Sequence, residues 1–255
     1  MRLIVVFLLG LAATPAFAVD FHATTSQEFQ VALTEAAGNG ASDTIYLQAG
    51  VYVGGFSHLS LENESLTICA EPGLGADDVI IDGAEMDRGL NLVNLEYRTT
   101  FTVKHVTIRN GRDTSHGGLY IETPHGDIVV TDCIFHSNDG GKSLAAYAEI
   151  TYPGLNQAGQ GSVYFQRNIV RDNGYGDYSS HPSAAVILKI RPNGTMLVEE
   201  NTITGNFVKG TSSGAGGLYA QTETDGIITI RKNIISNNTG STWGVAGVKI
   251  WQGNI

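Results

Sequence analysis

The chain has 255 residues, of which 42% are hydrophobic and 16% charged, and its formal net charge is −10. This length and composition suit one folded domain with a sizeable core, and six prolines are too few for a disordered linker. The acidic balance argues against nucleic acid and anionic lipid as partners, because those surfaces would repel this one.

Residues 1–18 have the features of a secretory signal peptide. Arg2 supplies the positive start, the run from Leu3 to Leu11 is apolar, and Ala16-Phe17-Ala18 is a small-x-small cleavage site. The apolar run is too short to cross a bilayer as a helix, and no later stretch approaches 18 apolar residues. We therefore expect export to the periplasm, the outer surface or the medium, with no membrane-spanning segment in the mature chain; the alternative is an uncleaved anchor.

Residues 19–43 are predicted to form an N-terminal cap that contains one amphipathic helix, from Thr25 to Ala37. Thr25 and Glu28 have the spacing of a capping box, and Gly38 can end the helix in a left-handed conformation. The apolar residues follow the helical period: Phe29, Ala32, Leu33 and Ala36. We expect this helix to cover the first turn of the fold that follows.

From residue 44 to 255 the chain is organised by a repeat. Its copies begin at Val103 (VKHVTIRNG), Val130 (VTDCIFHSN), Phe165 (FQRNIVRDN), Val198 (VEENTITGN) and Ile230 (IRKNIISNN), at intervals of 27, 35, 33 and 32 residues. Each unit adds a strand that follows small residues, such as GGLYI from Gly117. Short strands of period 2 at such intervals predict an all-β fold, a right-handed parallel β-helix solenoid; a β-sandwich would not be expected to repeat the same Asn at the same phase.

The repeated polar residues are predicted to be structural. One slot holds Cys133, Asn168, Asn201 and Asn233, and a second holds Asn138, Asn173, Asn206 and Asn238. Rungs of a β-helix lie about 4.8 Å apart, so such residues stack into ladders whose amides donate and accept along the column. Cys69 and Cys133 are two turns apart, too far for a disulfide, so both are expected to be buried free thiols.

Several of these motifs resemble a known group of proteins. The stretch from Ser26 to Tyr52, the tetrapeptides Gly117-Gly118-Leu119-Tyr120 and Gly216-Gly217-Leu218-Tyr219, and Phe135-His136-Ser137-Asn138 are similar to bacterial right-handed parallel β-helix proteins of the polymorphic outer-membrane-protein type, with a pectate-lyase-like fold. The resemblance covers nearly the whole mature chain. It implies the fold but not one function, since adhesins, tail fibres, lyases, hydrolases and epimerases share it.

Candidate functional residues lie in the loops after the second Asn column, between Arg112 and His181. A lyase would need a base such as Lys142 or His181, and a hydrolase two carboxylates roughly 5–10 Å apart. The opposite loop column shows even less pattern; it holds Glu122, His125, Asp127, Arg191, Glu223 and Asp225. The candidates for catalysis are Asp113, His116, Asp139, Lys142, Asp177 and His181, and those for sugar stacking are Tyr175 and Tyr178.

Two hypotheses follow. The first is an exported non-enzymatic protein with an adhesive or glycan-binding surface role, and the second is a polysaccharide-active enzyme, a lyase before a hydrolase or epimerase. No cofactor is expected; Ca²⁺ binding by loop carboxylates has no supporting motif. The sequence stops within a turn at Ile255, which predicts an incomplete β-helix or an uncapped end that self-associates.

Overall fold

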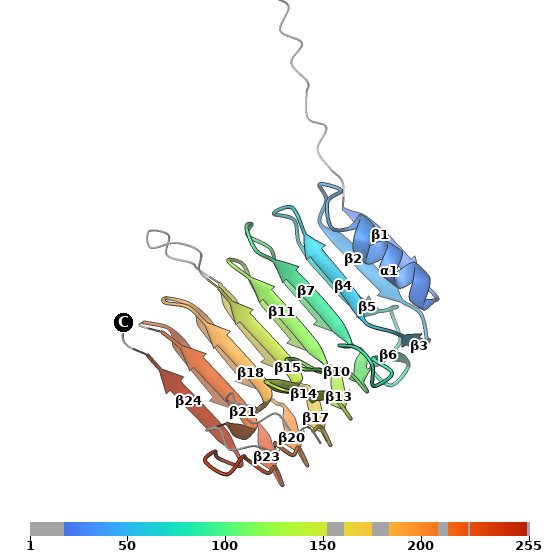
Figure 1. Cartoon of the computed structure of the whole chain (residues 1–255). Helices are drawn as coiled ribbons and strands as arrows, with labels where there is room; N and C mark the ends of the chain where they lie inside the picture. The colour runs from blue at the N-terminus through green and yellow to red at the C-terminus, as the bar shows by residue number, and fades with distance from the viewer. Residues whose placement is uncertain (1–17, 152–160, 175–183, 209–213, 224, 254–255) are drawn as a thin grey trace, which may run out of the picture.

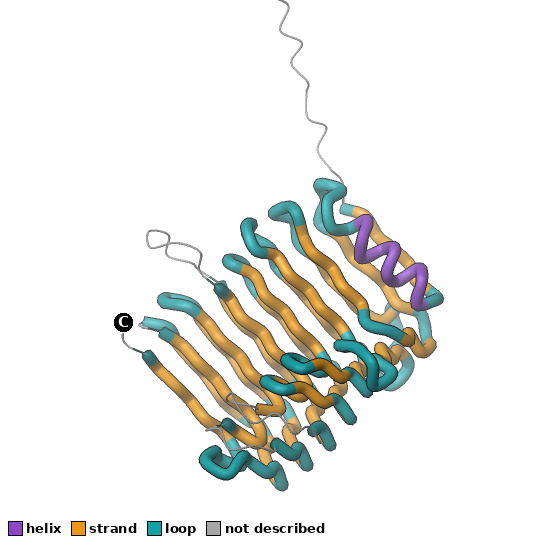
Figure 2. The backbone as a smooth tube through the Cα atoms, in the orientation of Figure 1, coloured by secondary structure: helices purple, strands orange, loops and turns teal. Residues whose placement is uncertain are grey.

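The computed structural model describes residues 18–151, 161–174, 184–208, 214–223 and 225–253. In this part of the chain one helix and 24 strands form a parallel β-helix, as predicted. Its three long sheets run side by side along one axis (Figures 1 and 2), and every strand pairing is parallel.

Each turn of the coil contributes one strand to each sheet, in the order sheet A, sheet B, sheet C. Sheet A consists of β1 (Val19–Ala23), β2 (Asp43–Leu47), β5 (Leu66–Ala70), β8 (Phe101–Lys104), β12 (Ile128–Thr131), β16 (Ser162–Gln166), β19 (Thr195–Glu199) and β22 (Ile227–Arg231). Sheet B consists of β3 (Gly50–Val53), β6 (Val79–Asp82), β9 (Thr107–Arg109), β13 (Ile134–His136), β17 (Ile169–Arg171), β20 (Thr202–Thr204) and β23 (Ile234–Ser236). Sheet C consists of β4 (Phe56–Ser60), β7 (Leu90–Asn94), β11 (Leu119–Thr123), β15 (Ser143–Ile150), β18 (Ala184–Ile190), β21 (Ala215–Thr222) and β24 (Val248–Gln252). Between sheets B and C, β10 (Arg112–Asp113) pairs with β14 (Asp139–Gly140).

The core lies inside the coil, where side chains of period 2 from all three sheets meet. Phe101, Phe135 and Phe165 are fully buried there, and the rings of Phe135 and Phe165 stack at 6.2 Å on neighbouring rungs. Because alternate residues of every strand point inward, each rung buries its apolar set only against the rungs beside it.

The N-terminal end of the coil is covered by α1 (Ser26–Glu35), which lies alongside β4 of sheet C (Figure 1). Phe29 and Leu33 fill the end of the core. The helix also satisfies strand edges: Ser26 Oγ accepts from the Val53 N–H at 2.8 Å, and the Gln30 amide bonds both the N–H and the C=O of Ser57 at 3.0 and 2.9 Å. The expected cap region additionally holds β1, which pairs with β2 and so already belongs to sheet A.

At the helix start, one detail differs from the predicted capping box. Thr25 accepts from the Glu28 N–H at 3.2 Å as expected, but the Glu28 carboxylate reaches Thr24, whose N–H and hydroxyl donate at 2.8 and 2.7 Å. The strand β1 ends at Ala23, and the next residue, Thr24, supplies the N–H that the Glu28 carboxylate binds in place of the Thr25 N–H.

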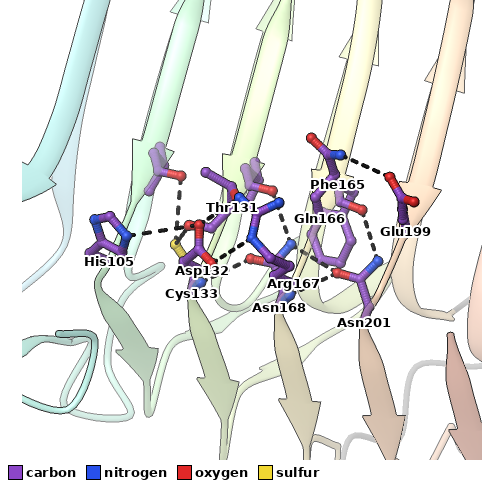
Figure 3. Close-up of polar contacts among 12 residues, drawn as sticks. His105, Thr131, Asp132, Cys133, Phe165, Gln166, Arg167, Asn168, Glu199 and Asn201 are labelled. Carbon is purple, nitrogen blue, oxygen red and sulfur yellow. Dashed lines mark hydrogen bonds and ion pairs between the residues drawn. The ribbon is translucent and has the colours of Figure 1, made fainter. Parts of the chain in front are cut away.

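The corner between sheets A and B holds the first amide ladder (Figure 3). The Asn168 Oδ1 accepts from the Cys133 N–H at 3.0 Å, the Asn201 Oδ1 from the Asn168 N–H at 2.8 Å, and the Asn233 Oδ1 from the Asn201 N–H at 2.9 Å. The Nδ2 of Asn168 also donates to the Asn201 Oδ1 at 3.1 Å. Each amide therefore links its own rung to the next, and Asn168 and Asn201 are buried.

The second ladder, at the corner where sheet B ends, follows the same rule. The N–H of Gly111 donates to Asn138 at 2.9 Å, and the N–H groups of Asn138, Asn173 and Asn206 donate to the next Asn along the column, which ends at Asn238, at 3.0 to 3.2 Å. Main-chain groups that a corner would leave unpaired are thus satisfied by side chains, which buried corners require.

Outside the first ladder runs a column of charged residues in the left-handed conformation. Asp132 and Arg167 have φ of 56° and 54°, and the Arg167 Nε lies 2.8 Å from the Asp132 carboxylate (Figure 3). His105, at φ 57°, approaches the other side of Asp132 at 3.8 Å, and Glu200 pairs with Lys232 at 2.9 Å. All five residues have positive φ, which residues other than glycine seldom adopt, and their side chains contact one another along the column.

Both cysteines are free and buried, which confirms the prediction of two unpaired thiols. Cys69 lies on β5 and Cys133 follows β12, with β8 between these two strands in sheet A. Burial raises the pKa of the Cys133 thiol to about 12, so it stays protonated and occupies its ladder slot as a small apolar residue.

The last described rung is less covered than the first. Its inward residues Ile228, Ile230 and Ile235 are only partly buried, and Ile250 is 58% exposed. In the described part of the chain, the structure contains no helix with the length and apolar character needed to cross a membrane.

Candidate functional site

The outer face of sheet C carries an unusual set of side chains. Its strands are aligned so that two outward positions recur on every rung. The first outward row is Ser57, Asn91, Tyr120, Tyr147, Ile187, Tyr219 and Lys249. The second outward row is Leu59, Val93, Glu122, Glu149, Lys189, Gln221 and Trp251.

Aromatic rings dominate the middle of the first outward row. Tyr120 and Tyr147 stack with ring centroids 5.2 Å apart and planes 12° apart, and the His116 ring lies 4.7 and 4.3 Å from them. The Arg88 guanidinium covers the other side of Tyr120 at 4.8 Å. Tyr147 is only 6% exposed, so its ring is a support for the neighbouring groups, whereas Tyr120 is half-buried.

The second outward row and the residues just beyond it bring acids and bases together. The Tyr120 and Tyr147 hydroxyls donate short hydrogen bonds to Glu122 and Glu149, each two residues further along its own strand. Lys189 Nζ lies 3.7 Å from the Glu149 carboxylate and donates to the Tyr147 hydroxyl at 2.8 Å. The three carboxylates and two cations of this cluster, which we call the sheet C cluster, are Glu122, Glu149, Glu223, Lys189 and Arg191.

Arg191 joins two of these carboxylates. Its guanidinium lies 3.8 Å from Glu149 and makes a short ion pair with Glu223, while its Nε is buried without a hydrogen-bond partner among the described residues. The Arg191 side chain is 35% exposed and that of Glu149 15%, so the cluster is partly desolvated but open to solvent. Charge pairs in such a setting interact more strongly than pairs in bulk water.

Both tyrosine hydroxyls remain protonated. Burial raises the pKa of Tyr147 far above its usual value, and the negative charge of Glu149 adds to the shift. Burial and the hydrogen bond to Glu122 likewise raise the pKa of Tyr120. These hydroxyls therefore act as hydrogen-bond donors that orient the carboxylates, and not as bases.

Four of the predicted catalytic residues lie on two neighbouring rungs: Asp113, His116, Asp139 and Lys142. Arg112 and Asp113 pair with Asp139 and Gly140 through β10 and β14, and the Lys142 N–H donates to the Ser115 C=O at 2.6 Å. Asp113 Oδ1 accepts from the N–H groups of Ser115 and His116 at 2.7 and 3.1 Å, which shapes the turn.

Within that group, His116 is poorly suited to act as a base on a bound sugar. It is 6% exposed, and its Nδ1 is 2.9 Å from the Ser143 hydroxyl, itself fully buried. Burial, assisted by the positive charges of Arg88 and Lys142, lowers the pKa of His116 to about 3, so the ring is neutral and weakly basic. Burial would raise the pKa of Asp113, but the N–H donors of Ser115 and His116 and the charge of Arg88 outweigh it and lower that pKa.

The remaining predicted residues, Asp177, His181, Tyr175 and Tyr178, lie outside the described residues, as does nearly all of the predicted signal peptide. Among the described residues, no group of three or more His, Cys, Asp or Glu side chains is arranged to hold a metal ion.

Sequence reasoning missed the sheet C cluster. It assigned Glu122, Arg191 and Glu223 to a loop column of little pattern and did not single out Tyr120, Tyr147, Glu149 or Lys189. A signal was present, because Tyr-x-Glu occurs at Tyr120 and Tyr147 and Tyr-x-Gln at Tyr219, each on a strand that follows small residues. A tyrosine at the same position in each of these strands indicates that their side chains form one outward row.

The comparison with known families gives one result. Residues 91–254, well over half of the chain, match the family model described as right handed beta helix region. The matched region contains every residue of the sheet C cluster. The match confirms the right-handed parallel β-helix and does not distinguish the polymorphic outer-membrane-protein type within it. No curated protein and no solved structure matches the chain.

Proposed function

The chain belongs to the right-handed β-helix family, and we propose that it binds a glycan chain along the outer face of sheet C, as an exported adhesive or glycan-binding protein. The observation that carries this proposal is the set of aromatic, carboxylate, amide and cationic side chains on the two outward rows of β11, β15, β18 and β21, interrupted in the first row by Ile187. Binding alone is sufficient for an adhesive role.

The geometry suits a linear sugar polymer. Neighbouring strands place equivalent groups about 4.8 Å apart, close to the length of one sugar ring, so a chain lying along the axis meets one rung per ring. Sugar hydroxyls both donate and accept hydrogen bonds, and the second outward row offers carboxylates, an ammonium and the Gln221 amide. Trp251, 43% exposed in the same row, adds an aromatic surface for the apolar side of a ring.

Charge on this face favours a neutral glycan. Three carboxylates face two cations in the sheet C cluster, and Lys189 and Arg191 are already paired with Glu149 or Glu223. A polyanionic sugar would have to break those pairs and approach a chain of net charge −10. Neutral hydroxyls can join the existing hydrogen bonds without separating charges.

A panel of soluble neutral and acidic polysaccharides, tested by affinity electrophoresis and calorimetry with the mature chain, tests the proposal. Tyr120→Ala and Lys189→Ala should weaken binding at least tenfold. Tyr164→Ala, which removes a half-buried outward tyrosine of sheet A, is the matched control and should bind as the parent does. Equal loss in all three variants, or no binding to any polysaccharide, would refute a site on sheet C.

A polysaccharide-active enzyme is the second candidate, favoured by one observation. Glu122 and Glu149 occupy paired positions on neighbouring strands and so put two carboxylates side by side on the glycan face. An assay for new reducing ends and for unsaturated products over the same polysaccharide panel separates an enzyme from a binding protein, and a hydrolase from a lyase.

A further inference from the structure

We propose that Glu122 and Glu149 hydrolyse the bound glycan with retention of anomeric configuration, Glu149 as nucleophile and Glu122 as acid and base. This inference rests on the proposed glycan site and adds a reaction and two roles to it. It places the chemistry on strands of sheet C and not in the loops between sheets B and C.

The spacing of the pair selects the reaction. Glu122 and Glu149 are register partners of β11 and β15, whose backbones lie about 4.8 Å apart, and the tyrosine rings whose hydroxyls bind the two carboxylates lie 5.2 Å apart. Retaining glycosidases hold their two carboxyl groups about 5–5.5 Å apart, whereas inverting ones need about 6.5–9.5 Å to admit a water molecule. Adjacent rungs therefore match the retaining geometry, and only carboxylates two rungs apart would match the inverting one.

The two carboxylates are held in the same orientation by the same device. Each accepts from the hydroxyl of a tyrosine two residues earlier, and those tyrosines stack on each other. The rings of Tyr120 and Tyr147 are further fixed by His116 and, for Tyr120, by Arg88. Carboxylates positioned by rigid partners on strands are oriented before substrate arrives.

Their surroundings differ, and the difference assigns the roles. Glu149 has Lys189 at 3.7 Å, Arg191 at 3.8 Å and the Tyr147 hydroxyl beside it, so its negative charge is stabilised by two cations. Glu122 has the Tyr120 hydroxyl and no ion pair with a described residue. The two cations beside Glu149 suit the group that attacks as an anion, so we assign the nucleophile's role to Glu149 and the proton transfers to Glu122.

The reaction balances with water as the only co-reactant. The Glu149 carboxylate attacks the anomeric carbon, a carbon–oxygen ester bond forms, the glycosidic bond breaks, and the Glu122 proton goes to the leaving oxygen. Water then enters, gives its proton to Glu122 and its hydroxyl to the anomeric carbon, and the ester breaks to release Glu149. Two inversions give retention, and one water is consumed per bond cleaved.

The test uses the mature chain on borohydride-reduced neutral polysaccharides, with new reducing ends measured chemically and product anomers read by proton NMR at early times. The parent protein should release products of retained configuration. Glu122→Gln and Glu149→Gln, which keep the shape of the side chain, should each lower the rate about 10³-fold. Glu200→Gln, at the corner between sheets A and B, is the control and should keep the parent rate.

Two further measurements separate a loss of catalysis from a loss of folding or binding. Azide should restore cleavage of a dinitrophenyl glycoside by Glu149→Ala and yield the glycosyl azide, and both Gln variants should bind polysaccharide and melt as the parent does. Binding without any hydrolysis, inverted or unsaturated products, or unchanged rates in both Gln variants would overturn the reaction and leave glycan binding intact. Absence of binding as well as hydrolysis would overturn both proposals.

Discussion

Two columns of side chains cross the same rungs of this β-helix and differ in what they repeat. At the corner between sheets A and B, the ladder repeats Asn on three successive rungs after Cys133, and each Asn bonds the main chain of its neighbour. On the outer face of sheet C, the residue changes from rung to rung, and side chains bond chiefly other side chains. Both columns share one spacing, set by the backbone.

The difference separates scaffold from candidate function. A corner amide is buried and bonds main-chain groups of the neighbouring rung, so a replacement without an amide removes those bonds. An outward residue of sheet C faces solvent or another side chain, so its chemistry can vary while the strands stay paired. The corner ladder should therefore control stability and the outer face of sheet C should control binding. Four experiments test that division.

The largest expected effect is that of Asn201→Ala. It removes the acceptor of the Asn168 N–H and Nδ2 groups and the donor to the Phe165 C=O, all buried. Two or three unpaired groups should lower the free energy of unfolding by ~2–4 kcal/mol, or the melting temperature by ~5–15 °C, measured by circular dichroism. Asn91→Ala, the same change on sheet C, should cost below ~1 kcal/mol; equal losses would contradict the division.

The second largest effect on stability is expected from acid, which would protonate the buried ring of His116. Its folded-state pKa of about 3 is below the usual 6.5, so the unfolded chain binds the proton more readily. Stability from this residue is thus present above pH 6.5 and declines as the pH falls toward 3, by ~2 kcal/mol at pH 5. The ring faces Arg88, Lys142, Lys189 and Asp113.

Denaturant unfolding between pH 5 and 7 checks this effect. His116→Phe keeps an aromatic ring against Tyr120 and Tyr147 and should flatten the profile over that range. His58 is also buried with a lowered pKa, so a residual slope of the same sign is expected. A profile unchanged by His116→Phe would show that the ring titrates normally in the folded protein.

A stabilising change should be available in the ladder itself. Cys133 stands in the Asn slot, where its thiol donates to the Val103 C=O at 3.6 Å. Cys133→Asn would extend the column by one rung, with its Nδ2 placed to donate to the Asn168 Oδ1. We expect a gain of ~0.5–1.5 kcal/mol in urea unfolding. A loss of stability would mean that the Cys133 site lacks room for an amide.

The smallest effect on stability is expected from Tyr219→Phe. Among the described residues, its hydroxyl donates only to the Gln221 side chain at 3.2 Å, and the ring that fills the space remains. The free energy of unfolding should change by less than ~0.5 kcal/mol. A larger loss would show that the outer face of sheet C supports the fold and would blur its contrast with the corner.

The repeat could be predicted from the sequence because it depends only on the spacing of residues within one unit. Asn168, Asn201 and Asn233 occupy the same place in the same nine-residue unit, so their alignment follows from counting residues. The helix was readable for the same reason, as Phe29 and Leu33 follow a period of 3.6. The bond from Glu28 to Thr24 was not, because it depends on where β1 ends.

The sheet C cluster could not be read in this way, because the loops between its strands vary in length. Register partners Tyr120 and Tyr147 are 27 residues apart, but Tyr147 and Ile187 are 40 apart. The pairing of β15 with β18 and of β18 with β21 also shifts register at their starts. Counting along the chain therefore does not show that Glu122, Glu149 and Lys189 stand side by side.

The class of fold, the capping helix, the two unpaired thiols and the positions of the corner amides could be predicted from the sequence alone. These depend on periodicity within one unit and on backbone hydrogen bonds that every rung must satisfy. Which outward side chains meet depends on the tertiary structure. That choice is set by strand register across loops of unequal length, and it brought Tyr147, Glu149, Lys189 and Arg191 to one face.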